Sequence, residues 1–200
     1  MDVIYECADS FSKLLSKKYN FVVSKKRKII SFTVDFAETD FYHLAGFQYL
    51  NDLDIERDPR NTINVIKKHE ITDEMLKKSK HYTCSSDEER DVEARIDRFR
   101  FMEQYLDINN LIKIFSVRND KDLHSAIKAD YIIESQLPGT NKTVYIFLRK
   151  RQEKDTFCVV SFFEKKRVAY GGEKLYWMLK EKIHDGTREI LFQHKNYQLG

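Results

Sequence analysis

The chain of 200 residues contains few of the residue types that build disulfide-linked or loop-rich proteins. It has 3 Cys, 6 Gly and 2 Pro. The cysteines lie far apart and form no CxxC pair, so neither a disulfide framework nor a zinc site is indicated. The scarcity of Pro and Gly leaves no obvious linker, and this favours a single domain that spans residues 1–200.

Long apolar runs and targeting signals are also missing. No run of about 18 apolar residues occurs, so no membrane span and no membrane partner are expected. The N-terminal stretch MDVIYECADSFSKLL is acidic and amphipathic, and it lacks the basic start and the cleavage site of a signal peptide. We therefore expect a cytoplasmic protein.

The common catalytic motifs are absent as well. The sequence has no GxxxxGK[ST], GxGxxG, HExxH or GxSxG motif and no EF-hand loop. Its six histidines never occur at metal-ligand spacing. Nucleotide-hydrolysing and nicotinamide enzymes are thus disfavoured, and we expect neither a cofactor nor a metal.

What the chain does contain is charge and aromatic side chains. Charged residues make up 34% and aromatic residues 13% of the sequence, which is typical of a globular protein. Residues 1–109 carry 18 basic and 21 acidic residues, whereas residues 110–200 carry 17 and 11. The C-terminal part is therefore the better contact for an anionic partner, although a solvated basic face explains the excess equally well.

Hydrophobic periodicity predicts an α+β fold with N-terminal helices packed on an antiparallel β-sheet. Helices are expected over residues 2–18, 41–53 (capped by Asp40), 62–69, 72–80 and 85–106 (capped by Ser86), with a further helical piece at Leu111–Phe115. Strands are expected at Phe21–Ser24 and Ile29–Phe36, which flank the basic turn KKRK, and then at ADYIIESQL, KTVYIFLRKR and DTFCVVSFF. A last helix, Glu173–Ile183, should end at Asp185-Gly186.

Alternation along the last two predicted strands separates an aliphatic from an aromatic face. In KTVYIFLRK, Val144, Ile146 and Leu148 share one face, and Thr143, Tyr145, Phe147 and Arg149 share the other. In DTFCVVSFF, Phe157, Val159, Ser161 and Phe163 share a face. A face with aromatic rings, Arg and Ser could stack bases and hold phosphates, but Tyr and Phe in strands are more often core.

The segment TDFYHLAGFQYLND holds a histidine in an otherwise apolar helix. His43 could be a hydrogen-bonded core residue, or it could transfer protons near neutral pH. Gly46, three residues later, should mark close packing of this helix against a strand. The KKRK turn offers a similar choice between a phosphate contact and a plain solvated turn.

Several of these stretches together resemble a known family. FYHLAG, ADYII, YIFLRK, CVVSFF and the following Tyr170 are similar to the phage-type nuclease domains grouped with barnase, EndoU, colicin E5/D and RelE, in particular the fourth such group. The resemblance covers residues 38–172. It leaves residues 1–37 as an N-terminal elaboration of helix and hairpin, and residues 173–200 as a C-terminal helix and tail.

The resemblance implies a metal-independent endoribonuclease, which would cleave RNA through its 2′-OH to a 2′,3′-cyclic phosphate. The matching positions are His43, Arg149 and Ser161 as catalytic candidates. Lys128, Tyr145, Lys150 and Tyr170 are candidates for substrate binding. Members of such families are often toxins of toxin–antitoxin or phage-defence systems, so RNA and a protein or RNA antitoxin are the implied partners. The alternative is a non-catalytic α+β module that binds RNA or protein.

Overall fold

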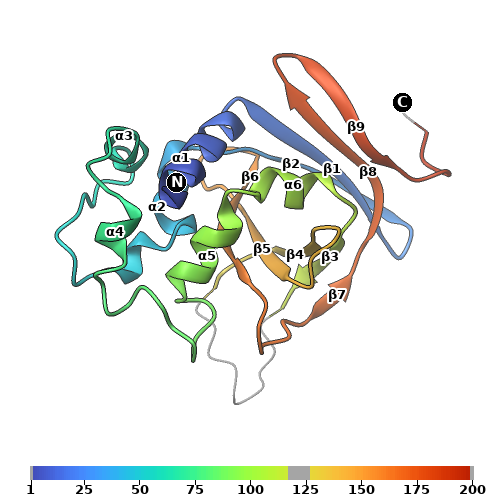
Figure 1. Ribbon diagram of the computed structural model, residues 1–200. Helices are drawn as coiled ribbons and strands as arrows, with labels where there is room; N and C mark the ends of the chain where they lie inside the picture. The colour runs from blue at the N-terminus through green and yellow to red at the C-terminus, as the bar shows by residue number, and fades with distance from the viewer. Residues whose placement is uncertain (1, 117–126, 199–200) are drawn as a thin grey trace.

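The computed structural model describes residues 2–116 and 127–198 (Figure 1). Its helices are α1 (Val3–Leu14), α2 (Glu38–Leu44), the 3-10 helix η1 (Phe47–Tyr49), α3 (Thr62–Lys67), α4 (Asp73–Leu76), α5 (Val92–Phe99) and α6 (Met102–Asp107). Its strands are β1 (Lys17–Lys25), β2 (Lys28–Val34), β3 (Leu111–Phe115), β4 (Tyr131–Gln136), β5 (Thr143–Lys150), β6 (Phe157–Glu164), β7 (Gly172–Lys174), β8 (Tyr176–His184) and β9 (Thr187–Gln193).

The fold is mixed α+β, as predicted, but the sheet is larger than expected. The nine strands of the described residues form one curled sheet in the order β7-β3-β4-β5-β6-β2-β1-β8-β9 (Figure 1). Most pairs are antiparallel. The exception is β2 with β6, which run parallel and meet at Val34 and Phe157. Helices α2 and α5 pack against β6, so both helices lie close to the strand that carries Ser161.

The predicted β1–β2 hairpin is confirmed, and its basic turn is solvated. Lys26 and Arg27 both have positive φ, at 46° and 70°, as a two-residue hairpin turn of the primed type requires even without glycine. Lys25 is paired with Glu173 at 2.7 Å. The hairpin lies inside the sheet, because β1 pairs with β8 on its other edge. The β1–β2 hairpin is therefore an integral part of the sheet.

Two predicted helices proved to be strands. Leu111–Phe115 is β3, and Glu173–Ile183, expected as a terminal helix, contributes to β7 and β8. Pairing of β8 with β1 and β9 supplies hydrogen bonds on both edges, and this tertiary pairing overrides local helix propensity. Asp185 and Gly186, with φ of 49° and 76°, form the tight β8–β9 turn and do not end a helix.

Helix boundaries differ from the predictions in the segment that carries His43. Helix α2 begins at Glu38 and ends at Leu44, and Gly46, with φ of 85°, turns the chain into η1. Asp40 lies in the first turn of α2, and its carboxylate accepts the Ala37 N–H at 2.8 Å. It therefore stabilises the helix N-terminus from the third helical position and is not the N-cap residue. Farther along, Asp91 caps α5 in place of Ser86 by accepting the Ala94 N–H at 3.1 Å.

The sheet separates two cores. Val144, Ile146 and Leu148 of β5 pack with the helices in the main core, as the alternation predicts. Tyr145 and Phe147 belong to a second cluster, the aromatic core, which also contains Phe115, Ile132, Phe163 and Tyr170. Both rings are fully buried. This face of the sheet therefore offers no surface for stacking bases, and the core interpretation of its aromatic residues is correct.

A bulge in β6 changes the predicted faces of that strand. The β5–β6 register pairs Phe147 with Ser161 but Leu148 with Val159, so β6 has one extra residue here. Val159 consequently lies in the main core, while Phe163 lies in the aromatic core. The expected single face for Val159 and Phe163 is wrong for this reason.

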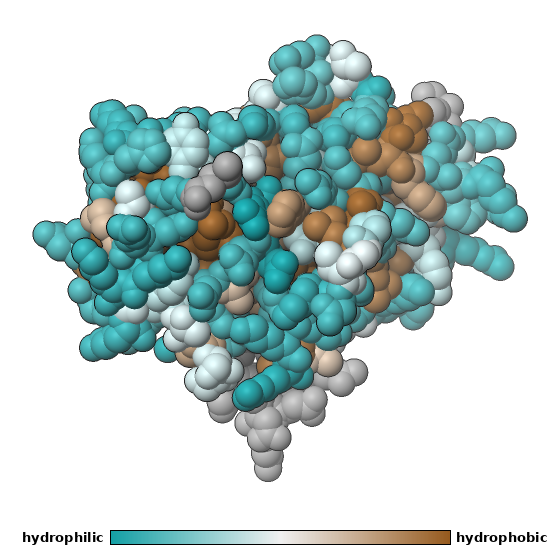
Figure 2. Space-filling view, in the orientation of Figure 1, coloured by the Kyte–Doolittle hydropathy of each residue, from teal (hydrophilic) through white to brown (hydrophobic). Residues whose placement is uncertain are grey.

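The surface in the view of Figure 2 is mostly hydrophilic, with apolar atoms in separate patches. Ile190 of β9 is 48% exposed. No helix within the described ranges has the length and apolar character needed to cross a bilayer.

Candidate active site

A cleft of about 990 Å³ opens between α2, η1 and the β5–β6 hairpin. Five of the seven residues predicted for the site line it: His43 from α2, Arg149 and Lys150 from the end of β5, Ser161 from β6, and Lys128 from the segment before β4. Segments that are distant in sequence thus contribute an imidazole, a guanidinium, a hydroxyl and two ammonium groups to one cleft.

His43 occupies the last turn of α2, and its side chain is exposed to the cleft. It is therefore not a core histidine. The protein wall beside the ring removes water from it, and this desolvation lowers the pKa of His43. Asp40 opposes the shift, and the positive charge of Arg149 adds to it. The imidazole is consequently biased towards its neutral, proton-accepting form.

Arg149 and Lys128 provide positive charge that no carboxylate of the described residues neutralises. Both side chains are exposed, and neither forms an ion pair with any residue that the structure describes. Lys150 differs, because its ammonium group is 2.7 Å from Asp155. Arg149 and Lys128 are therefore cations that an anionic ligand in the cleft can reach.

Ser161 lies at the β6 bulge, opposite Phe147. Its side chain is partly exposed in the cleft, and its hydroxyl has no hydrogen-bond partner within the described part of the chain. Because the bulge adds a residue just before Ser161, the hydroxyl reaches the cleft from a strand whose neighbouring residues are core.

Arg151 fixes the start of α2, and sequence reasoning did not identify it. Its guanidinium donates to Asp35 Oδ1 at 2.5 Å and to Asp40 Oδ2 at 2.6 Å. Asp35 follows β2 and also accepts the Thr156 hydroxyl at 3.0 Å. Bidentate and charge-assisted bonds of this kind hold geometry well. They join the helix that carries His43 to the strand that carries Arg149.

Arg95 of α5 joins the other end of that helix to β6. The side chain is 1% exposed and donates to Leu44 O at 3.3 Å, to Phe162 O at 2.6 Å and to Glu89 O. Leu44 follows His43 in the chain, and Phe162 follows Ser161. A buried guanidinium is costly unless carbonyls or carboxylates satisfy it, so its position is strongly determined.

Gly46 makes room for this arginine. A Cβ built on Gly46 would lie 3.1 Å from Arg95 Cδ and 3.2 Å from Val92 Cγ2. The close packing predicted for Gly46 is therefore real, but its partner is helix α5 and not a strand.

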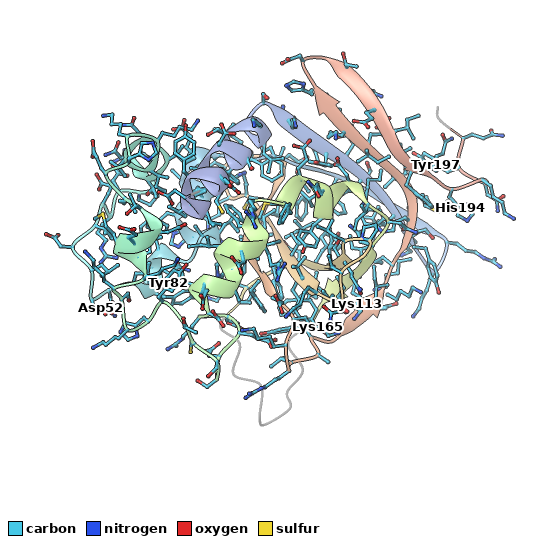
Figure 3. The ribbon with its side chains drawn as sticks, viewed as in Figure 1. Asp52, Tyr82, Lys113, Lys165, His194 and Tyr197 are labelled. Atoms are coloured by element: carbon cyan, nitrogen blue, oxygen red, sulfur yellow. The ribbon has the colours of Figure 1, made fainter. Side chains whose placement is uncertain are left out.

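Two predicted substrate-binding residues lie outside the cleft. Tyr145 is fully buried, donates to Val168 O at 3.0 Å and has the ammonium group of Lys165 5.4 Å from its ring centroid. Lys165 and Lys113 lie near each other in Figure 3, and both are paired with Glu134.

Tyr170 is also buried and donates to Glu89. Neither tyrosine can touch a phosphate in the cleft while the aromatic core is closed.

An α+β domain with such a polar cleft fits the class of small nuclease-like domains. The family model described as PBECR4, phage-Barnase-EndoU-ColicinE5/D-RelE like nuclease4, matches residues 3–196, nearly the whole chain. The chain therefore belongs to this nuclease-like family. The match extends beyond the 38–172 range of the sequence resemblance and includes α1, the β1–β2 hairpin and β7 to β9. No curated protein and no solved structure matches the chain.

Proposed function

We propose that the protein is a metal-independent endoribonuclease and that the cleft is its active site. The observation that carries the proposal is the convergence of His43, Arg149 and Ser161 on one cleft in a chain of a nuclease-like family. These residues supply the three functions that metal-free RNA cleavage needs: a proton acceptor, a cation for the phosphate, and a donor for a non-bridging oxygen.

In the proposed reaction the neutral imidazole of His43 accepts the proton of the ribose 2′-OH. The 2′-oxygen forms a bond to phosphorus, and the bond from phosphorus to the 5′-oxygen breaks. His43 then returns its proton to the departing 5′-oxygen. The products are a 2′,3′-cyclic phosphate and a 5′-hydroxyl, so every proton is accounted for without another reactant.

The remaining groups stabilise the negative charge that develops on the phosphorane. Arg149 has a planar guanidinium suited to two-point binding of phosphate oxygens, and it is not tied to a carboxylate within the described residues. Ser161 donates its hydroxyl to a non-bridging oxygen. Lys128 and Lys150 attract the neighbouring phosphates of the strand, with Lys128 contributing more because Asp155 engages Lys150.

We further propose that this activity serves as the toxin of a toxin–antitoxin or phage-defence system. The support for this proposal is the family match, whose description names colicin E5/D and RelE beside barnase and EndoU. An RNA or protein antitoxin would then restrain the enzyme by occupying or covering the cleft.

The experiment compares wild type with His43→Ala on a mixed RNA substrate in the presence of EDTA. Wild type should cleave, and His43→Ala should be about 100- to 10,000-fold slower, because a positioned acid–base group contributes that much. His184→Ala is the matched control, since His184 lies on β8 away from the cleft. In a bacterial expression strain, induction of the wild-type protein should arrest growth, and induction of His43→Ala should not.

Undiminished cleavage by His43→Ala would remove this residue from the mechanism. If EDTA abolishes the activity, the metal-independent mechanism is wrong. If growth is unaffected by an enzyme that cleaves RNA in vitro, the toxin role falls while the nuclease proposal stands.

A further inference from the structure

One wall of the cleft carries an aromatic ring that the proposed chemistry does not use. Tyr49, the last residue of η1, lines the cleft and is only partly buried. Its hydroxyl has no hydrogen-bond partner in residues 2–116 or 127–198. The rings of the aromatic core are buried in comparison, so Tyr49 is an aromatic side chain that a ligand in the cleft can reach.

The turn that presents Tyr49 is held from both ends. The Tyr49 N–H donates to Gly46 O at 3.0 Å. Arg57 donates to the carbonyl oxygens of Phe47, Leu50 and Leu53 at 3.4, 2.9 and 2.6 Å. Phe47 O and Leu50 O also accept the backbone N–H groups of Leu50 and Leu53, at 3.2 Å in both cases. Together these bonds hold the backbone around Tyr49 before any ligand arrives.

The ring itself packs against a cation from the core. The guanidinium carbon of Arg95 lies 5.7 Å from the Tyr49 ring centroid, within the range of a cation–π contact. Arg95 also bonds the carbonyls beside His43 and Ser161. One buried residue therefore sets the position of the ring relative to both candidate catalytic groups.

Basic and aromatic groups reach the cleft from different segments. Arg149 and Lys128 come from the end of β5 and the segment before β4, whereas Tyr49 comes from η1. His43 is joined to η1, because the Gln48 amide donates to His43 O at 3.3 Å. A ligand held by the cations would thus share the cleft with an accessible aromatic ring.

We propose that Tyr49 is the stacking platform for an unpaired base beside the scissile phosphate, which makes single-stranded RNA the substrate class. This inference rests on the proposed function and names the substrate of the same site. A base in a duplex already has both faces covered by its neighbours, so it cannot be held on a protein ring without leaving the stack. A flat ring accepts any of the four bases, because every base has a π-face, so stacking alone predicts little sequence preference.

Binding is measured without cleavage, with a fluorescent single-stranded oligonucleotide that carries a 2′-O-methyl group on every ribose. Fluorescence anisotropy gives the dissociation constants of wild type, Tyr49→Ala and Tyr49→Phe. We expect Tyr49→Ala to bind about 5- to 150-fold more weakly, the range seen for one stacked base, and Tyr49→Phe to bind within about twofold of wild type. The same oligonucleotide in a duplex should bind wild type more weakly than the single strand.

The matched control is Tyr176→Ala. Tyr176 of β8 is 60% exposed and lies outside the cleft, so its loss removes an accessible ring without touching the proposed platform. It should leave the dissociation constant unchanged. Equal losses for Tyr49→Ala and Tyr176→Ala would overturn the proposal, as would equal affinity of wild type for single strand and duplex.

A second arm begins with wild-type protein, so its first result does not depend on the folding of a variant. Single abasic sites are placed along the oligonucleotide, and one position should weaken binding by the same factor as Tyr49→Ala. At that position Tyr49→Ala should cause no further loss. Additive losses, or no sensitive position, would overturn the stacking platform. Stacking without any RNA cleavage would instead overturn the proposed function and leave the platform standing.

Discussion

At the residue scale, the proposed chemistry depends on the protonation state of His43. Its ring has to be neutral to accept the 2′-OH proton, and desolvation together with the nearby Arg149 charge lowers its pKa. Asp40 acts in the opposite direction, but it is already engaged by Arg151. The site thus keeps the imidazole available as a base at pH values where an ordinary histidine is partly charged.

The pH dependence follows from this shift. We expect the acid limb of kcat/KM to have its midpoint below about 6.5, the ordinary pKa of histidine, because activity appears as His43 loses its proton. An NMR titration of the imidazole reports the same group without relying on activity. Arg149→Gln should raise the pKa of His43, since a positive charge near the ring is removed.

Lys18→Gln serves as the control for that titration. Lys18 is exposed on β1 and does not line the cleft, so the same change in net charge should leave the His43 midpoint in place. A midpoint above 6.5 in wild type, or an equal shift in both variants, would contradict the proposed electrostatic arrangement.

Only some of the candidate site residues could be found in the sequence. His43, Arg149 and Ser161 became candidates through the resemblance, and alternation correctly put Tyr145 opposite the aliphatic face. It could not tell that this second face is itself a core. Arg95, Arg151 and Tyr49 were missed because their roles depend on contacts with distant carbonyls and carboxylates, and nothing in their local sequence distinguishes them from surface arginines or an ordinary helix tyrosine.

At the scale of elements, the cleft is a junction between helix α2 and the β5–β6 hairpin. Arg151 fixes the beginning of α2, and Arg95 fixes its end. The strands of the hairpin were predictable because both are short runs rich in β-branched and aromatic residues. The bulge was not predictable, because it depends on the pairing of Leu148 with Val159 across the two strands. Similarly, β8 reads locally as a helix and becomes a strand only through pairing with β1 and β9.

The packing of α2 against α5 can be tested with two glycines of similar conformation. Gly46 and Gly186 have φ of 85° and 76°, but only the Cβ of Gly46 would approach other atoms, namely Arg95 and Val92. Alanine at either position should cost about 1–2 kcal/mol of unfolding free energy for the left-handed backbone. Gly46→Ala should cost about 1–3 kcal/mol more for overpacking.

Denaturant unfolding of both variants measures the difference between their unfolding free energies. Cleavage rates then show whether the loss of stability is accompanied by a loss of activity. Gly46→Ala should also lower kcat, because Arg95 positions the segments that carry His43 and Ser161, whereas Gly186→Ala should not. Equal unfolding free energies for the two variants would show that the Gly46–Arg95 contact does not constrain the fold.

At the scale of the whole molecule, the sheet is continuous from β7 to β9, and the N-terminal residues lie in its middle. Phe11 of α1 packs on Phe41 of α2 and Phe99 of α5, with ring centroids 5.6 Å apart in both cases. The family match beginning at residue 3 agrees with this arrangement. We therefore expect the N-terminal hairpin to fold together with the rest of the sheet.

Deletion of residues 2–37 tests this continuity. The truncated chain would lose α1, β1 and β2, leaving β8 without its partner β1 and the main core open to water. We expect it to show no cooperative thermal transition by circular dichroism. Deletion of residues 195–200, which lie beyond β9, is the control and should leave the transition in place. A cooperative transition in the N-terminal deletion would show that a 38–200 unit folds alone.

The most direct measurement of the central claim uses a DNA oligonucleotide that contains one ribonucleotide, incubated with the enzyme and EDTA. If the 2′-OH is the nucleophile, the strand should be cut only after the ribonucleotide, and mass spectrometry should find a 2′,3′-cyclic phosphate on one product and a 5′-hydroxyl on the other. Cleavage at deoxynucleotides, or a product that ends in a 5′-phosphate, would contradict the proposed mechanism.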